Sequence, residues 1–203
     1  MKKEIINLSP HHFYDIIRFY GAEKNSSIKK RKFFSFLKNN FRVLRPRQLI
    51  VFCVSLARHL FKQAIGKTSF LPHPHLHQFH EMVAIVKKHP SLRIRMVIGT
   101  DNVCKGCIYN KDNHCHDVVS FLKNNPSLEE FNKQLDKRIM EVCNIKEKEI
   151  LTPIQLLEKG ELYLNNLKYI YSQNDDWHIK EREEKFKKGL QMYIKWHNLG
   201  NII

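Results

Sequence analysis

The apolar residues of the chain recur mostly at the period of an α-helix. In the segment 9–21, four apolar residues lie three or four positions apart and so share one helical face: Phe13, Ile16, Ile17 and Tyr20. Similar stripes predict helices at about 26–40, 46–66, 127–143, 152–171 and 175–200, and one that ends near residue 88. Gly21 is expected to end the first helix, and three helices begin after typical N-cap residues: Ser9, Ser127 and Thr152.

One segment alternates between apolar and polar positions instead. This segment, "SLRIRMVIG" at 91–99, predicts a single β-strand that ends at Gly99. The chain is therefore predicted to be mainly α with a minor β component (α+β), with helices around one core and a strand leading into a cysteine loop. We expect one metal-binding domain over 1–175 with a basic helical insertion at about 24–76. A C-terminal helical extension over 176–203 should pack on the same domain.

Composition narrows the class of protein. The chain has 203 residues, of which 42% are hydrophobic, which is enough for one core. No run reaches the roughly 18 apolar residues of a membrane-spanning helix, and the N-terminal segment lacks the long apolar region of a secretory signal. We therefore expect a cytoplasmic protein. Its five cysteines, three of them close together, fit metal binding in a reducing compartment better than a disulfide framework.

Positive charge is concentrated in one part of the chain. The formal net charge is +15, and no Asp or Glu occurs between residues 24 and 80. A basic block over 24–67 is compatible with an anionic partner, either a nucleic acid or an acidic protein, and equally with a solvated helix face. The candidate nucleic-acid contacts are Lys29, Lys30, Arg31, Lys32, Arg42, Arg45 and Arg47.

The segment "GTDNVCKGCIYNKDNHCHD", at 99–117, carries candidate metal ligands. Cys104 and Cys107 form a C-x-x-C pair, and Cys115 follows seven residues later. Thiolates select zinc or iron–sulfur clusters over hard cations. Zinc needs four closed ligands, which three sulfurs and either His114 or His116 can supply, and a cluster usually takes four cysteines. The spacing therefore predicts a metal centre without deciding between zinc and iron–sulfur.

Several motifs resemble those of a small bacterial and archaeal family of unknown function. The shared pattern is a His-His pair, a Phe-x-Gly and a D-x-x-C-x-x-C with a further Cys, which correspond here to His11, His12, Phe19, Gly21, Asp101, Cys104, Cys107 and Cys115. The resemblance covers about 8–21 and 77–157. It implies an iron–sulfur protein, with a [4Fe–4S] cluster on the three cysteines of the loop.

The resemblance also bears on the fourth ligand. Members of the family carry a Cys three residues after the second histidine, where this chain has Asp15. Asp15 is therefore the preferred fourth ligand; the alternatives are an open iron or a ligand from His11, His12, His116 or Cys143. His11 and His12 are also candidate catalytic residues. Because adjacent helical residues point about 100° apart, only one of the two is expected to face the loop.

Three functions remain open at this point. The first is a cytoplasmic iron–sulfur protein of unknown reaction, with the cluster held by the C-x-x-C loop. The second is a zinc-stapled nucleic-acid-binding module that uses the basic block at 24–67. The third is a redox carrier or sensor. The sequence does not decide whether the protein is an enzyme.

Overall fold

The computed structural model describes residues 5–22, 50, 53–54, 57, 77–107, 109–118, 127–172 and 176–199. Apart from the isolated positions between 50 and 57, the basic block lies outside the described residues. The same holds for the helices predicted at 26–40 and 46–66 and for the seven candidate nucleic-acid contacts, so their role remains a prediction.

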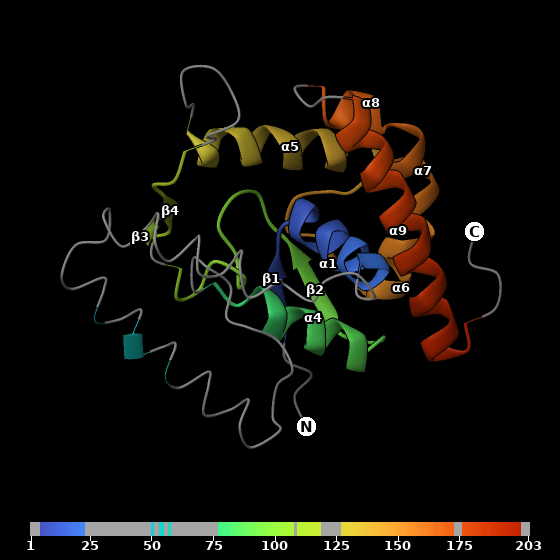
Figure 1. Ribbon diagram of the computed structural model, residues 1–203, viewed down its shortest axis with the longest axis horizontal. Helices are drawn as coiled ribbons and strands as arrows, with labels where there is room; N and C mark the ends of the chain where they lie inside the picture. Colours follow the sequence, from blue (N-terminus) through green and yellow to red (C-terminus); the bar gives the residue numbers. More distant parts are fainter. Residues whose placement is uncertain are drawn as a thin grey trace.

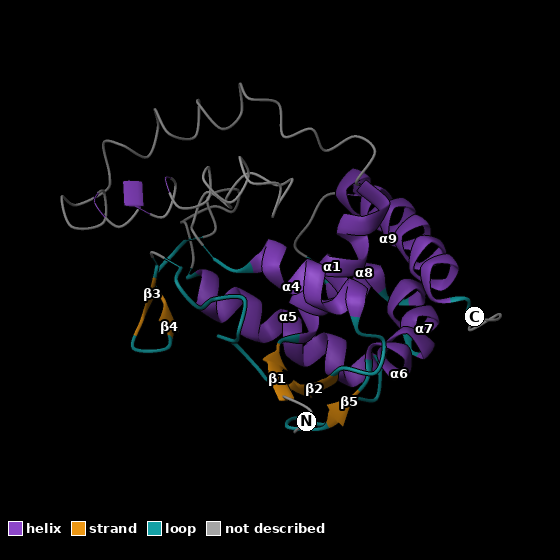
Figure 2. Cartoon of the chain, turned by 90° about the horizontal axis from the view of Figure 1, so that it is seen from below, coloured by secondary structure: helices purple, strands orange, loops and turns teal. Residues whose placement is uncertain are grey.

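A three-stranded sheet lies at one edge of the molecule (Figure 2). Its order is β1-β2-β5, formed by Ile5–Leu8, Arg93–Met96 and Ile150–Leu151. β1 runs parallel to the central β2, with Ile6 opposite Ile94, whereas β5 runs antiparallel to it. Only β2 was predicted from the sequence, because it is the one strand with a clear alternation of apolar and polar residues.

The main helices lie on one side of this sheet (Figures 1 and 2). They are α1 (Pro10–Ala22), α4 (Phe79–Lys88), α5 (Leu128–Val142) and α9 (Asp176–His197). Each of these four helices was predicted. Ser127 accepts a hydrogen bond from the backbone of Glu130 and so begins α5 as expected.

The long helix predicted at 152–171 is broken into three short ones. They are α6 (Pro153–Glu158), α7 (Gly160–Asn165) and α8 (Leu167–Ile170). The start is as predicted, because Thr152 and Gln155 form a reciprocal capping box. At the second break, the Asn166 side chain donates to the backbone carbonyl of Leu162. Asparagine bonds to nearby backbone in this way in turns as well as in helices, so the apolar stripe continues while the helix does not.

Gly21 has a different role from the one predicted. It lies inside α1, and a Cβ atom there would overlap the backbone carbonyl of Lys185 in α9. A Cβ on Gly189 of α9 would likewise overlap the carbonyl of Ile17 in α1. The two glycines therefore allow α1 and α9 to pack backbone against backbone, along the contact seen in Figure 1.

The buried side chains form one hydrophobic core between the helices and the sheet. Tyr14, Ile94, Leu156 and Phe186 come from four different elements and are almost completely buried. The observed architecture is mainly α with a minor β component, which confirms the predicted fold class. None of the helices in the described part of the chain is both long enough and apolar enough to cross a membrane.

Candidate metal centre

The first turn of α1 and the cysteine loop meet at one pocket. The pocket has a cavity volume of about 110 Å³, and Cys104, Cys107 and Cys115 all line it. His11 and His12 line it from α1, and Leu128, Glu129 and Asn132 line it from the first turns of α5. The predicted ligands of the loop and the predicted histidine pair therefore converge on the same space.

Asp101 shapes the turn that carries the first two cysteines. Its Oδ1 accepts hydrogen bonds from the backbone N–H groups of Val103 (2.8 Å) and Cys104 (3.4 Å). The backbone of Cys107 then donates to the carbonyl of Cys104 at 3.0 Å. Gly106 adopts a φ of 83°, a left-handed conformation that glycine adopts without steric cost. These bonds explain why an aspartate three residues before the first cysteine suits this loop.

A small hairpin returns the third cysteine to the pocket. Its strands are β3 (Asn110–Lys111) and β4 (His114–Cys115), with Asn110 opposite Cys115. The two turn residues, Asp and Asn at 112–113, have positive φ values of 52° and 64°, as expected for a tight hairpin turn. Oε2 of Glu129 accepts the Cys115 backbone N–H at 2.9 Å and ties the hairpin to α5.

The three thiols are favoured in their neutral form when no metal is bound. Burial raises the pKa of Cys104 to about 12, and the nearby Asp101 carboxylate adds to the effect. Burial also raises the pKa of Cys107 and of Cys115. A metal would have to displace these protons, because it binds the thiolate and not the thiol.

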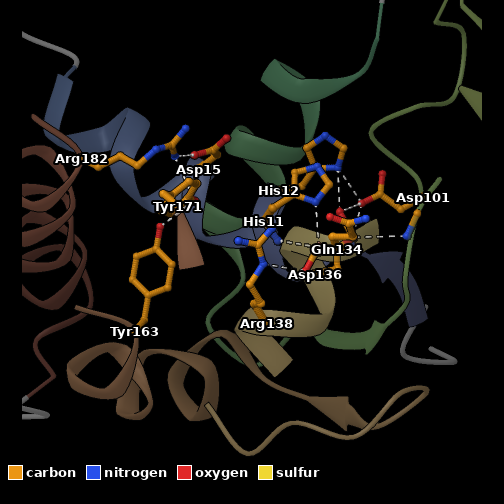
Figure 3. Close-up of polar contacts among 12 residues, drawn as sticks. His11, His12, Asp15, Asp101, Gln134, Asp136, Arg138, Tyr163, Tyr171 and Arg182 are labelled. Atoms are coloured by element: carbon orange, nitrogen blue, oxygen red, sulfur yellow. Dashed lines mark hydrogen bonds and ion pairs between the residues drawn. The ribbon is translucent and has the colours of Figure 1, made fainter. Parts of the chain in front are cut away.

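His11 is held by a buried carboxylate on α5. Oδ1 of Asp136 lies 2.7 Å from Nδ1 of His11 and also accepts the His11 backbone N–H (Figure 3). Oδ2 of the same carboxylate accepts the N–H of Gly99. Burial favours the neutral imidazole, but the Asp136 carboxylate outweighs it and raises the pKa of His11.

His12 is held by the carboxylate of the cysteine loop. Oδ2 of Asp101 lies 2.8 Å from Nδ1 of His12, and it also accepts from the backbone (2.6 Å) and hydroxyl (2.9 Å) of Ser9. Burial favours the neutral acid, but His12 and the hydrogen bonds from His12 and Ser9 lower the pKa of Asp101 to about 2. Ser9, predicted as an N-cap, thus binds the loop with its side chain.

Both histidines line the pocket, which corrects the expectation that only one would face the loop. Their ring centroids lie 4.1 Å apart. Both residues lie in the first turn of α1, where side chains lean toward the N-terminal end of the helix, so adjacent residues can line the same pocket.

The structure places the other candidate ligands away from the pocket. The Asp15 carboxylate pairs with Arg182 of α9 at 2.6 Å and with Arg18 at 3.3 Å, as Figure 3 shows for Arg182. Cys143 is buried at the far end of α5, where it accepts a hydrogen bond from the Tyr14 hydroxyl. His116 is exposed and does not line the pocket. The preferred fourth ligand, Asp15, is thus already held by two arginines.

The tightest group of donor atoms is not the set of three cysteines. A ring nitrogen of His12, a carboxylate oxygen of Asp101 and the sulfur of Cys104 lie within 4.8 Å of one another. Within the described residues this is the group of three donors that meets that spacing, and it contains only one sulfur. The three sulfurs therefore surround the pocket and do not gather at a single point.

Sequence reasoning missed two residues of the site, Asp136 and Glu129. Neither belongs to a recognisable motif. Asp136 does carry a signal, because it directly follows the apolar residue Leu135 on a face of α5 that is otherwise buried. A charged residue at such a position is expected to have a polar partner.

Comparison with known proteins gives one match. The model of a family described as a protein of unknown function (DUF1284) matches residues 73–177. The chain belongs to this family. No curated protein and no solved structure matches the chain. The DUF1284 match includes the cysteine loop, Asp101 and Asp136, but it does not include the histidine pair of α1, which the motif resemblance had covered.

Proposed function

We propose that this protein binds an iron–sulfur cluster in the pocket through Cys104, Cys107 and Cys115. The observation that carries the proposal is the convergence of three thiols, from a tight turn and from a hairpin, on one space. Three sulfurs with two histidines form a donor set that suits iron or zinc and excludes hard cations such as magnesium. All five cysteines of the chain are free thiols, in keeping with a reducing compartment such as the cytoplasm.

The spacing of the sulfurs favours a cluster over a single zinc ion. In a tetrahedral zinc site with Zn–S bonds of about 2.3 Å, any two sulfurs lie about 3.8 Å apart. The three sulfurs of the loop do not form a group whose members all lie within 4.8 Å of one another. A cluster binds each cysteine at a different iron and so needs sulfurs that are farther apart.

A bound cluster would supply one-electron transfer or, at an iron without a protein ligand, a Lewis acid. The protein's own contribution is to hold the donors. Asp101 fixes the turn of Cys104, and Glu129 fixes the strand of Cys115. A redox carrier or sensor needs only a cluster whose ligands are held in place. We therefore propose that role in preference to a catalytic one.

Metal analysis tests the proposal directly. The protein should be purified without oxygen, and its absorption spectrum and its iron, sulfide and zinc contents should be measured. We expect a brown protein with absorbance near 400 nm and about four irons and four sulfides per chain. One zinc ion without iron or sulfide would contradict the proposal and would make the loop a structural zinc site.

Cysteine variants identify the ligands. Cys104→Ser and Cys107→Ser should each remove most of the iron, because a serine hydroxyl is a poor ligand for a cluster that prefers thiolates. Cys53→Ser is the matched control, since Cys53 is also a free thiol but is exposed and lies outside the pocket. Equal iron content in the Cys104 variant and the Cys53 variant would contradict the proposed ligand set.

A further inference from the structure

A metal centre with four ligands needs one more ligand besides the three cysteine sulfurs. Cys143, the remaining buried cysteine, binds Tyr14 at the far end of α5 and is not a candidate. We infer that His12 completes the metal centre through Nε2, with Asp101 as the residue that holds the imidazole in place. This inference rests on the proposed cluster, and it assigns the fourth ligand to a residue other than the one the family pattern suggests.

The oxygens of the carboxylates near the pocket already accept hydrogen bonds from protein groups. An ionised carboxylate offers about four lone-pair sites. Asp101 accepts from Ser9 twice and from the His12 ring at Oδ2, and from the backbone of Val103 and Cys104 at Oδ1. With five donors on its two oxygens, Asp101 has no lone pair left for a metal.

Glu129 is occupied in the same way. Its Oε2 accepts the backbone of Cys115, and its Oε1 lies 3.0 Å from the His114 ring and 2.6 Å from Nζ of Lys133. Asp15 has its own cation, Arg182, on the side of α1 that faces α9. The Asp15 carboxylate is therefore used to attach α9.

His12 has the arrangement of a metal-binding histidine. Histidines that bind metals usually donate their second ring N–H to a carboxylate, which fixes the tautomer and the ring orientation. Nδ1 of His12 lies 2.8 Å from Asp101, so the tautomer that donates from Nδ1 to this carboxylate leaves the lone pair of Nε2 for a metal. A ring nitrogen of His12 also belongs to the close group of donors that includes the sulfur of Cys104.

His11 is the other residue of α1 that could be the fourth ligand, and a variant of His11 provides the control. It lines the same pocket and has its own carboxylate partner, Asp136, at 2.7 Å. However, it does not belong to the close donor group, and it is more deeply buried than His12. We therefore assign His11 to the wall of the pocket, where its ring packs against that of His12.

Pulsed electron paramagnetic resonance can detect the bond. The full-length protein is labelled with ¹⁵N-histidine, loaded with iron and sulfide without oxygen, and reduced with dithionite. We expect a ¹⁵N coupling typical of a directly bound imidazole in the wild type and in His11→Gln. In His12→Cys the coupling should be lost while the iron content stays at about four per chain, because a thiolate replaces the imidazole.

Two further readouts separate a ligand from a structural residue. His12→Cys should lower the reduction potential of the cluster, since an anionic thiolate replaces a neutral imidazole. Asp101→Asn should retain a weakened ¹⁵N coupling and should lose iron to a chelator roughly tenfold faster, as expected when the group that orients a ligand is changed.

Each contrary result has a clear meaning. A ¹⁵N coupling that persists in His12→Cys overturns the assignment and indicates another histidine, with His77 of the pocket wall as the next to test. A wild-type protein with four irons and no ¹⁵N coupling also overturns it and indicates an iron without a histidine ligand. A protein with zinc and neither iron nor sulfide overturns the proposed cluster itself, which metal analysis reveals before any resonance experiment.

Discussion

The two ends of α1 contrast in how they are held. At its first turn, His11 and His12 each contact a carboxylate from another element, and their rings border a pocket. Beyond the first turn, Tyr14 stacks on Tyr163 with ring centroids 4.0 Å apart, and Gly21 at the C-terminal end lies directly against α9. One helix therefore contributes both to a polar site and to a tightly packed core.

The difference shows two ways of fixing side chains. At the pocket end, charged hydrogen bonds hold the rings in one orientation while leaving space in front of them. At the packed end, the fit of apolar groups and backbone leaves no such space. A site that must admit a metal needs the first arrangement, because close packing would fill it. We expect a substitution at one end of α1 to leave the structure of the other end unchanged.

The largest effect is expected from filling the space between α1 and α9. In Gly189→Val, the new side chain would overlap the carbonyl of Ile17, so the helices must separate. We expect a loss of roughly 3 kcal/mol in the free energy of unfolding, or failure to fold. Urea denaturation measures this, with Lys188→Ala, an exposed neighbour on α9, as the control. A variant as stable as the control would show that the helices are not in close contact.

A smaller loss is expected from Asp136→Asn at the pocket end. Asp136 is fully buried and accepts from the His11 backbone, the His11 ring and the Gly99 backbone. An amide keeps the shape but not the charge, so we expect about 2 kcal/mol of destabilisation. Near-ultraviolet circular dichroism of the tyrosines at the packed end should stay unchanged below the transition. A changed spectrum would mean that the two ends are coupled.

The Asp15–Arg182 ion pair should make stability depend on pH. The neighbouring arginines lower the pKa of Asp15 well below its usual range, although burial acts in the opposite direction. A lowered folded-state pKa gives stability that is complete above the unfolded pKa of about 3.9 and is lost as the pH falls below it. The difference in unfolding free energy between wild type and Asp15→Asn should therefore be about 1 to 2 kcal/mol at pH 6 and should shrink toward pH 3. A constant difference would contradict a charged Asp15.

The smallest effect is expected at the edge of the packed end. Nζ of Lys87 lies 3.8 Å from the ring centroid of Trp196. Such a cation–π contact contributes about 0.5 to 1 kcal/mol at an exposed position. Lys87→Ala should lower the free energy of unfolding by that amount, whereas Lys88→Ala, on the exposed side of α4, should not. Equal effects of the two variants would show that the contact with Trp196 adds nothing.

The sequence predicted α1, α4, α5 and α9 because their apolar stripes report burial directly. It missed β1, whose sequence IINL does not alternate between apolar and polar residues, and β5, which is only two residues long. It also assigned Gly21 to a helix end. A glycine that ends a helix and one that permits a close helix crossing are identical in sequence, and only the position of α9 distinguishes them.

The candidate site was predicted in part. The cysteines and histidines were found because their side-chain chemistry and spacing are distinctive. Of their carboxylate partners, Asp101 belongs to the motif, whereas Asp136 was missed because it meets His11 across 125 positions of the chain and no local pattern records such a contact. The assignment of Asp15 to the metal followed the family pattern, whereas in this chain Arg182 of the C-terminal helix binds the same carboxylate.

The pairing of β1 with β2 has a practical consequence for dividing the chain. The family match begins at residue 73, so a fragment cut at its limits would keep the three cysteines of the loop. It would lose β1, whose residues hydrogen-bond to the edge of β2, and with it Ser9, His11 and His12. Such a fragment would expose one edge of β2 and would remove His11 and His12 from the pocket wall. The unit that carries the site is thus assembled from two separate stretches of the chain, and limits drawn from sequence similarity alone would divide it.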